Sequence, residues 1–583
     1  MKKVLAILLA AVMLFSLTAC GKKDAATGAG TKAAPLMTYL YNEGAGHKAI
    51  GEYLQSAFAA AGLNIQLESQ EWNTFLNTRK DGNYTIARNG WLGDYNDPIS
   101  FLDMWITTSG NNDCQLGKGA HKDVAIYDLD MTKWGGAKVE NGTWAETYDV
   151  IIGMIKKESD NAKRLEMMHA AEDLLMSTGA IVPIYYYTDL YMIDDSVKGF
   201  FSSPLGYKYF YGTTVEGKTA LDVCLASEPD TIDPALNSAV DGATLVSHLF
   251  AGLAKWAQDD NGQLAIVADC AEALVDPVVN ADGTVTYTYT LREGLKWSDG
   301  KDLKASDFEF AWKRAASAEL GADYGYMFDV VKGYNEGALE VTADDAARTI
   351  TVTLYNSVAY WNELLAFPTY FPVRADVVAD ESWATKPETY ISNGAYTMTG
   401  WTHDSVITLT KNENFIDADK VTMPTLNFYL SDDANNMLAN FKKGDWLMID
   451  DVPTNEIATL KKDYPSEFVI AGQLGTYYVC FNVNADLGLE TEEQRAEVRK
   501  AMALLIDRNY VCESVAQGGQ VPASSFVAMG LTDSNGKEFY QNAGDEAANG
   551  YIGYFDVSVE AFEDNCLKAV EILQKYYKLE IAD

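Results

Sequence analysis

The chain has 583 residues, of which 48% are hydrophobic and 22% charged. This composition is typical of folded globular proteins and excludes a disordered or collagen-like chain. Lysine and arginine total 45 and aspartate and glutamate total 83, which gives a formal charge of −38. A field of that sign repels phosphate groups, so we expect no nucleic-acid partner. The five histidines form no short metal-ligand spacing, and we expect neither a metal nor another cofactor.

The first twenty residues predict an export signal. A basic start, Met1–Lys3, precedes an apolar run over 4–17 that is too short to cross a membrane as a mature helix. The run is followed by Ala19, Cys20 and Gly21, which resemble the cleavage site of a bacterial lipoprotein. We therefore predict a signal peptide over 1–20, lipidation of Cys20 and a flexible tether over 21–35. An ordinary secretory signal with a chance cysteine is the alternative.

Patterns typical of helices and strands alternate along the rest of the chain. Apolar residues recur at helical spacing in three long segments, and every second residue is apolar in three short ones. We predict helices over 47–61, 163–176 and 562–577, and strands over 63–67, 84–88 and 285–291. Interleaved helices and strands favour an α/β architecture over a β-sandwich or a helical bundle.

Motifs of common enzymes are missing from the sequence. It contains no GxSxG, no HExxH, no P-loop motif and no GxGxxG after a predicted strand. Asp533–Gly536 has residue types found in calcium loops but lacks their full spacing, so we interpret it as an ordinary turn. We therefore predict a protein that is not an enzyme. An enzyme of the cell envelope is the less favoured alternative.

Several blocks of the sequence resemble the oligopeptide-binding proteins of ABC importers, which are extracellular solute-binding proteins of family 5. The blocks are 71–79, 87–98, 180–187, 228–234, 287–300, 393–396 and 498–508. The resemblance implies a type II periplasmic-binding-protein fold of the α/β class, with two large lobes around a cleft and an extra lobe. It also implies an oligopeptide ligand and, as partners, the permease subunits of an ABC transporter.

The order of these blocks differs from that of the family. Block 228–234 resembles the opening strand of the family's mature chain, whereas block 87–98 resembles a segment near its C-terminus. The sequence therefore predicts a circularly permuted order, with the family's two ends joined through 212–218. On this basis we place lobe I at 201–250 and 384–474, lobe II at 251–383, and lobe III at 36–200 and 475–583. A mis-assembled or artificial gene with the same parts is the alternative.

The resemblance assigns the ends of the ligand to charged residues. Asp94 matches the aspartate that binds the peptide ammonium, and a buried carboxylate suits that cation. Arg88, Arg79 and His47 match positions that bind the carboxylates of peptides of different lengths, and a guanidinium fork suits a carboxylate. The alternatives are a turn at Asp94, internal salt bridges for the arginines and a helix cap for His47.

Other positions are assigned to the body of the ligand. Gly90, Trp91 and Leu92 follow Asn89 on a predicted strand, whose amides and carbonyls would pair with an extended peptide. Three further residues match cleft-lining positions, although the aromatic ones also suit a core: Tyr324, Tyr478 and Val240.

Two positions depart from the family pattern. A family lysine is replaced by Ala516, and the cysteines that some members join in a disulfide are replaced by Leu92 and Gly475. Other ligands stay open, namely a dipeptide, a nickel chelate, haem or glutathione, as do an orphan peptide-sensing receptor and a non-functional rearrangement. We expect a monomer on the outer face of the bacterial cytoplasmic membrane, held by its lipid anchor, or in the periplasm.

Overall fold

The computed structural model describes residues 30–225, 227–259 and 261–580. The predicted signal peptide, Cys20 and most of the predicted tether lie outside these residues. Within them, no helix combines the length and the apolar character needed to cross a membrane.

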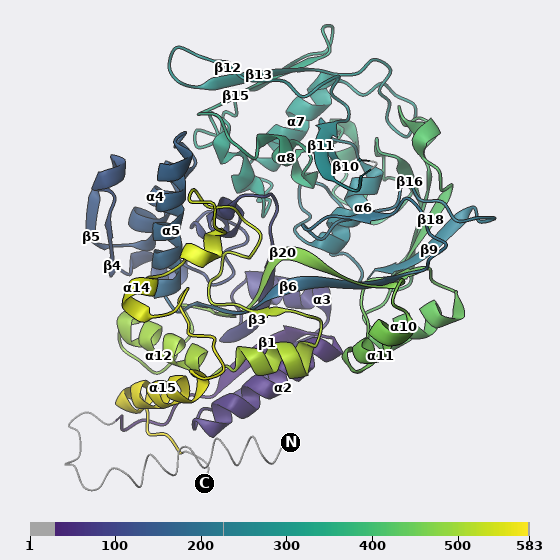
Figure 1. The fold of residues 1–583 in the computed structure, drawn as a ribbon. Helices are drawn as coiled ribbons and strands as arrows, with labels where there is room; N and C mark the ends of the chain where they lie inside the picture. Colours follow the sequence, from purple (N-terminus) through teal and green to yellow (C-terminus); the bar gives the residue numbers. More distant parts are fainter. Residues whose placement is uncertain (1–29, 226, 260, 581–583) are drawn as a thin grey trace, which may run out of the picture.

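A mixed sheet of 11 strands runs through the molecule (Figure 1). Its order is β16 (Tyr396–Thr402), β17 (Val406–Lys411), β18 (Thr425–Leu430), β9 (Ala220–Leu225), β19 (Met448–Ile449), β6 (Ile181–Ile193), β20 (Phe468–Phe481), β3 (Ile86–Leu92), β1 (Met37–Asn42) and β2 (Ile65–Gln70), while β21 (Val521–Pro522) pairs with β6. We refer to its two ends as the β16 end and the β2 end.

The two longest strands join these ends. β6 has 13 residues and β20 has 14, and they pair with each other in antiparallel fashion. β6 also pairs with β19 at the β16 end, and β20 also pairs with β3 at the β2 end. The ladder between β6 and β20 is interrupted, since Gly472 pairs with Thr188 but the next residue of β20 to pair is Thr476, with Tyr186.

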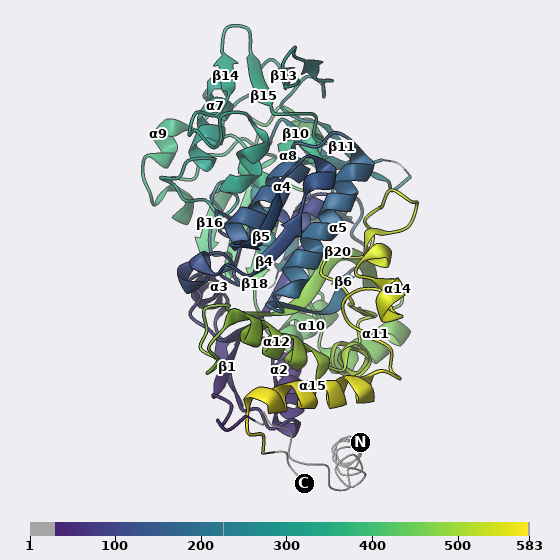
Figure 2. The ribbon, with the colours of Figure 1, turned by 90° about the vertical axis from the view of Figure 1, so that its left-hand side faces the viewer.

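Helices cover both ends of the sheet (Figures 1 and 2). Those near the β2 end are α2 (Ala45–Ala60), α3 (Trp72–Lys80), α12 (Glu492–Leu504) and α15 (Phe562–Tyr576), and those near the β16 end are α10 (Ala434–Lys443) and α11 (Ile457–Asp463). The C-terminal half of β20 is buried throughout because both of its faces are covered. Further helices are α4 (Val150–Ile155), α5 (Asn161–Ser177), α6 (Val240–Leu249), α13 (Arg508–Tyr510) and α14 (Glu546–Asn549).

Residues 251–383 carry separate small sheets, at the top of Figure 1. One is the hairpin of β10 (Ala254–Gln258) and β11 (Leu264–Ala268), and the other has the order β12 (Val278–Val279), β13 (Val285–Thr290), β15 (Thr349–Leu354) and β14 (Val341–Asp344). Packed with them are α7 (Ala305–Ala315), α8 (Trp361–Leu365) and α9 (Ala375–Val378). The remaining pairs of strands are β4 (Tyr127–Asp130) with β5 (Lys138–Gly142), and β7 (Phe201–Ser202) with β8 (Lys208–Tyr209).

The elements predicted from hydrophobic periodicity are confirmed within a few residues. The three helices are α2, α5 and α15, and the three strands are β2, β3 and β13. Gly62, which follows the end of α2, has φ 79°, a left-handed conformation that favours glycine after a helix end. The α/β class is thereby confirmed, while the boundaries of the three lobes stay predictions.

Candidate functional site

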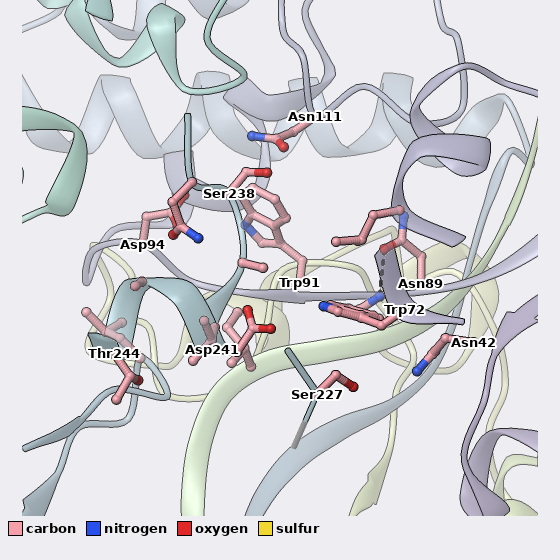
Figure 3. A pocket seen from close by; sticks show the side chains of 18 of the residues that line it. Asn42, Trp72, Asn89, Trp91, Asp94, Asn111, Ser227, Ser238, Asp241 and Thr244 are labelled. Carbon is pink, nitrogen blue, oxygen red and sulfur yellow. Dashed lines mark hydrogen bonds between the residues drawn. The ribbon is translucent and has the colours of Figure 1, made fainter. Parts of the chain in front are cut away.

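A cavity of about 360 Å³ lies between β3, α3, the start of α6 and the segment around Tyr324 (Figure 3). Nine of the ten residues predicted to bind peptide line it, and Tyr478 does not. The lining residues include Asn42, His47, Trp72, Arg79, Lys80, Arg88–Asp94, Asp113, Tyr187, Asn237–Asp241, Thr244, Tyr324, Phe367 and Gln473.

β3 presents an unpaired edge to this cavity. β20 pairs with β3 over its whole length, whereas on the other side β1 pairs only with Ile86 and Ala87. The N–H of Gly93 donates to the Leu474 carbonyl of β20 (2.8 Å), so the alternate peptide groups of Gly90 and Leu92 face away from β20. The Gly90 N–H donates to the Asn89 side-chain Oδ1 (2.8 Å). An extended ligand carbonyl could replace that acceptor.

Asp94 brings a buried carboxylate to one end of this edge. Its side chain is 7% exposed, and its Oδ1 accepts a hydrogen bond from the Tyr324 hydroxyl (2.9 Å). Its Oδ2 is buried without a hydrogen-bond partner, and no cationic side chain pairs with it among the described residues. Burial raises the pKa of the Asp94 carboxyl well above its usual value; the Tyr324 hydroxyl opposes this rise and Asp103 adds to it. A ligand cation would lower that pKa again.

Arg88 brings a buried cation to the other end of the edge. It is 8% exposed, donates to His47 Nε2 (2.8 Å), and pairs with no carboxylate among the described residues. Its guanidinium also lies over the rings of Trp72 and Tyr477, 5.7 Å from each centroid. Burial and the charge of Arg88 lower the pKa of His47 well below its usual value, so this ring is neutral and accepts a hydrogen bond from Arg88. Arg88 therefore lacks the counter-charge that a ligand carboxylate would supply.

Arg79, in contrast, has its counter-ion within the protein. Its Nε lies 2.8 Å from Asp113 Oδ2, which also accepts from the Asn89 side chain (2.9 Å). Burial lowers the pKa of Arg79, but Asp113 together with Tyr478, Cys480 and Tyr84 outweighs this effect, and the pKa is raised. Lys80 is matched as well, by Asp323. The internal salt bridge that was the alternative for the two arginines is present for Arg79 and not for Arg88.

The other predicted residues take distinct places. Val240 is the first residue of α6, and the Trp91 indole donates to the Ser100 carbonyl (2.8 Å). Tyr478 pairs with Asn89 across the ladder and is buried against Trp105 and Phe526, behind the cavity wall.

The two departures from the family pattern have different surroundings. Leu92 and Gly475 are direct partners across β3 and β20, and a Cβ added to Gly475 would lie 2.3 Å from Leu92 Cδ2. The leucine therefore occupies the space beside the glycine. Ala516 ends a short helical turn over 511–516 and does not line the cavity.

Sequence reasoning missed most of the lining residues, among them Asp241, Asn42 and Trp72. Asp241 lies in the first turn of α6. It directly follows Val240, which was predicted to line the cleft, and that neighbour was the only indication in the sequence. Asn42 ends β1 and Trp72 begins α3, and in the view of Figure 3 Trp72 lies between Asp241 and Asn42. Neither had a local pattern that distinguishes a cavity residue from a turn or core residue.

The chain is similar to known proteins over much of its length. Residues 17–113 and 266–573 match the family described as "Bacterial extracellular solute-binding proteins, family 5 Middle". The chain is 30% identical over 353 residues to the oligopeptide-binding protein OppA of Bacillus subtilis, covering 58% of this chain and 62% of that protein. It is also 30% identical over 338 residues to the dipeptide-binding protein DppE of the same organism, covering 56% and 59%. The chain thus spans about three fifths of the length of these relatives.

A solved structure shows the same fold. Haemophilus influenzae OppA, in complex with RPPGFSPFR, matches with a TM-score of 0.52 and 24% identity over 62% of this chain and 67% of that one. The murein tripeptide-binding protein MppA of Escherichia coli matches with a TM-score of 0.51 and 24% identity over 61% and 66%. The periplasmic-binding-protein fold predicted from the sequence is thereby confirmed.

Proposed function

Because the chain belongs to the bacterial extracellular solute-binding proteins of family 5, we propose that it captures short peptides in the cavity beside β3. One observation carries this proposal. Asp94 and Arg88 are opposite charges, both buried and both without an ionic partner among the described residues, at the two ends of one unpaired strand edge. A zwitterionic peptide lying along the edge supplies both missing charges and the missing strand.

The spacing supports a ligand of a few residues. Arg88 and Asp94 are six positions apart in the sequence, which corresponds to about 20 Å of extended strand. An extended peptide of about three to five residues, with room for the two side chains, fits that length. Its ammonium would bind Asp94, its carboxylate Arg88, and its peptide groups those of Gly90 and Leu92.

Delivery and location are proposed on the basis of the family. The protein would pass its peptide to the permease subunits of an ABC importer, as a monomer tethered outside the cytoplasmic membrane through lipidated Cys20. The predicted lobes I, II and III would move relative to one another about the strands that join the sheet ends.

We also propose the circularly permuted order. Gly30 N–H donates to the Gln574 carbonyl (2.9 Å) and Lys578 N–H to the Lys32 carbonyl (2.7 Å), so 30–32 and 574–578 lie side by side. The family match falls in two blocks, and the predicted joint at 212–218 lies between them. A chain with 580 joined to 36 and opened within 212–218 should fold and bind peptide with the parent's affinity. Loss of folding or of binding would contradict the proposal.

The central test is native mass spectrometry of the purified protein, combined with calorimetry. We expect co-purified peptides of a few residues, and binding of tetra-alanine after they are removed. A dipeptide, nickel chelate, haem or glutathione as the bound species, or an absence of peptide binding, would overturn the proposal.

A further inference from the structure

The charges that line the cavity do not balance for a simple zwitterion. Arg79 is matched by Asp113 and Lys80 by Asp323, whereas Arg88 and Asp94 have no ionic partner among the described residues. The two ends of a peptide neutralise those last two. Any further unpaired charge on the wall must then be neutralised by the body of the ligand, because a buried unpaired charge is costly.

Asp241 is a further unpaired charge on the wall, and its side chain is half-buried. It lines the cavity from the first turn of α6, and no cationic side chain pairs with it among the described residues. Its Oδ1 accepts a hydrogen bond from the Gly242 N–H (2.8 Å), which leaves Oδ2 for another donor. Figure 3 shows its carboxylate pointing away from α6, on the side where Trp72 and Ser227 lie. Burial raises the pKa of Asp241 to about 6, against the lowering effects of Gly242 and the nearby Trp72 indole. At neutral pH the group is therefore mainly ionised.

Asn42 lines the same cavity and fits a cation. It is 8% exposed, and its Oδ1 is buried without a hydrogen-bond partner, so it can accept from an ammonium or guanidinium. The Trp72 indole also lines the cavity, but Arg88 already lies over its ring, so Trp72 shapes the wall and does not bind a second cation. A helix-start role for Asp241 does not explain the unpartnered Asn42 oxygen.

We propose that Asp241, with Asn42, forms a subsite for one cationic side chain of the bound peptide, such as lysine, arginine or ornithine. The inference rests on the proposed function of the cavity. A subsite of this kind makes the preferred ligand a peptide with a net charge of about +1 at neutral pH. The reason is that the wall carries two carboxylates without an ionic partner among the described residues, Asp94 and Asp241, and one such arginine, Arg88.

The experiment compares tetra-alanine with its single-site lysine, norleucine and acetyl-lysine substitutions by calorimetry. Norleucine keeps the length of the side chain without its charge. We expect one position at which lysine binds about 10- to 100-fold more tightly than norleucine, as for a charge-assisted hydrogen bond in a closed site. Acetyl-lysine at that position should lose the gain, and this comparison needs no variant protein.

Two variants then assign the gain to Asp241. In Asp241→Asn, which keeps the acceptor for Gly242, the ratio of lysine to norleucine affinity should fall to within about 3-fold of unity. In Asp419→Asn, which removes an exposed charge outside the cavity lining, the ratio should stay at the parent's value. A thermal unfolding midpoint confirms that each variant is folded.

The outcomes separate this inference from the proposed function. Binding of tetra-alanine without a lysine gain at any position overturns the cationic subsite and leaves peptide capture intact. A lysine gain that persists in Asp241→Asn also overturns it. Failure of every peptide to bind the parent overturns the proposed function itself.

Discussion

Replacement of Asp94 by asparagine isolates the interaction with the peptide ammonium. The amide can still accept from Tyr324, but it offers no charge to a ligand. A full charge pair at about 4 Å and an effective dielectric constant of about 20 is worth about 4 kcal/mol. The raised pKa of Asp94 reduces this gain, because a protonated carboxyl must first lose its proton. We therefore expect Asp94→Asn to weaken binding of tetra-alanine by about 2–4 kcal/mol, or about 30- to 1000-fold.

A double-mutant cycle provides the assay. Calorimetry would compare tetra-alanine and N-acetyl-tetra-alanine on the parent protein and on Asp94→Asn. Acetylation should cost the parent about as much as the mutation does, and it should cost the variant little, because the two changes remove the same interaction. Equal affinities of the parent for the free and the acetylated peptide would refute the assignment of Asp94.

Four further measurements test other parts of the reasoning. Peptide binding should release protons, because an ammonium favours the ionised form of Asp94, and the affinity should fall as the pH is lowered. Calorimetry in buffers of different ionisation enthalpy measures the number of protons released, and a value of zero would contradict the role of Asp94. Arg88→Met should abolish the preference for free-acid over C-amidated peptides, worth about 1.5–3 kcal/mol, and an unchanged preference would exclude Arg88 as the carboxylate ligand. Glu172 accepts from the N–H groups of Phe526 and Val527 (3.0 and 2.8 Å), and burial raises its pKa from 4.5 to about 8. The ionised form of Glu172 is therefore disfavoured in the folded protein, so the free energy of unfolding should decline as the pH rises from about 4.5 to 8. Glu172→Gln should remove that part of the decline in urea titrations. The same dependence of the unfolding free energy on pH in the parent and the variant would contradict this. Small-angle scattering should show a smaller radius of gyration with peptide than without, and an unchanged value alongside confirmed binding would argue against closure about a hinge.

Local patterns in the sequence predicted the helices and strands, but not which charged side chains pair with one another. The helical spacing of apolar residues in α2, α5 and α15 and the alternation in β2, β3 and β13 are short-range signals, which the packed structure preserves. The candidate residues Asp94, Arg88 and His47 came from a family resemblance. Their convergence on one cavity depends on contacts between β3, α2 and the segment around Tyr324, which no single window of sequence contains.

The charge state of the cavity was the least predictable feature. Arg79 and Arg88 are the same residue type on neighbouring elements, yet Asp113 neutralises only the first. Asp113 is 34 residues from Arg79 and follows a loop, so its position depends on how that loop folds back. Asp241 was likewise hidden, because an acidic residue in the first turn of a helix is ordinarily explained by the helix dipole. Only the assembled cavity separates matched charges from unmatched ones.

The interruption in the ladder between β6 and β20 has a mechanical consequence. Between Gly472 and Thr476 of β20, no residue pairs with β6, so bending at this point breaks no hydrogen bond between β6 and β20. Leu474 and Gly475 remain bonded to Gly93 and β3 on the other side of β20, so this stretch is least restrained at Gln473. Gln473 also lines the cavity. A bound peptide thus touches the segment that bends, and substitutions there would alter affinity and the rate of opening together.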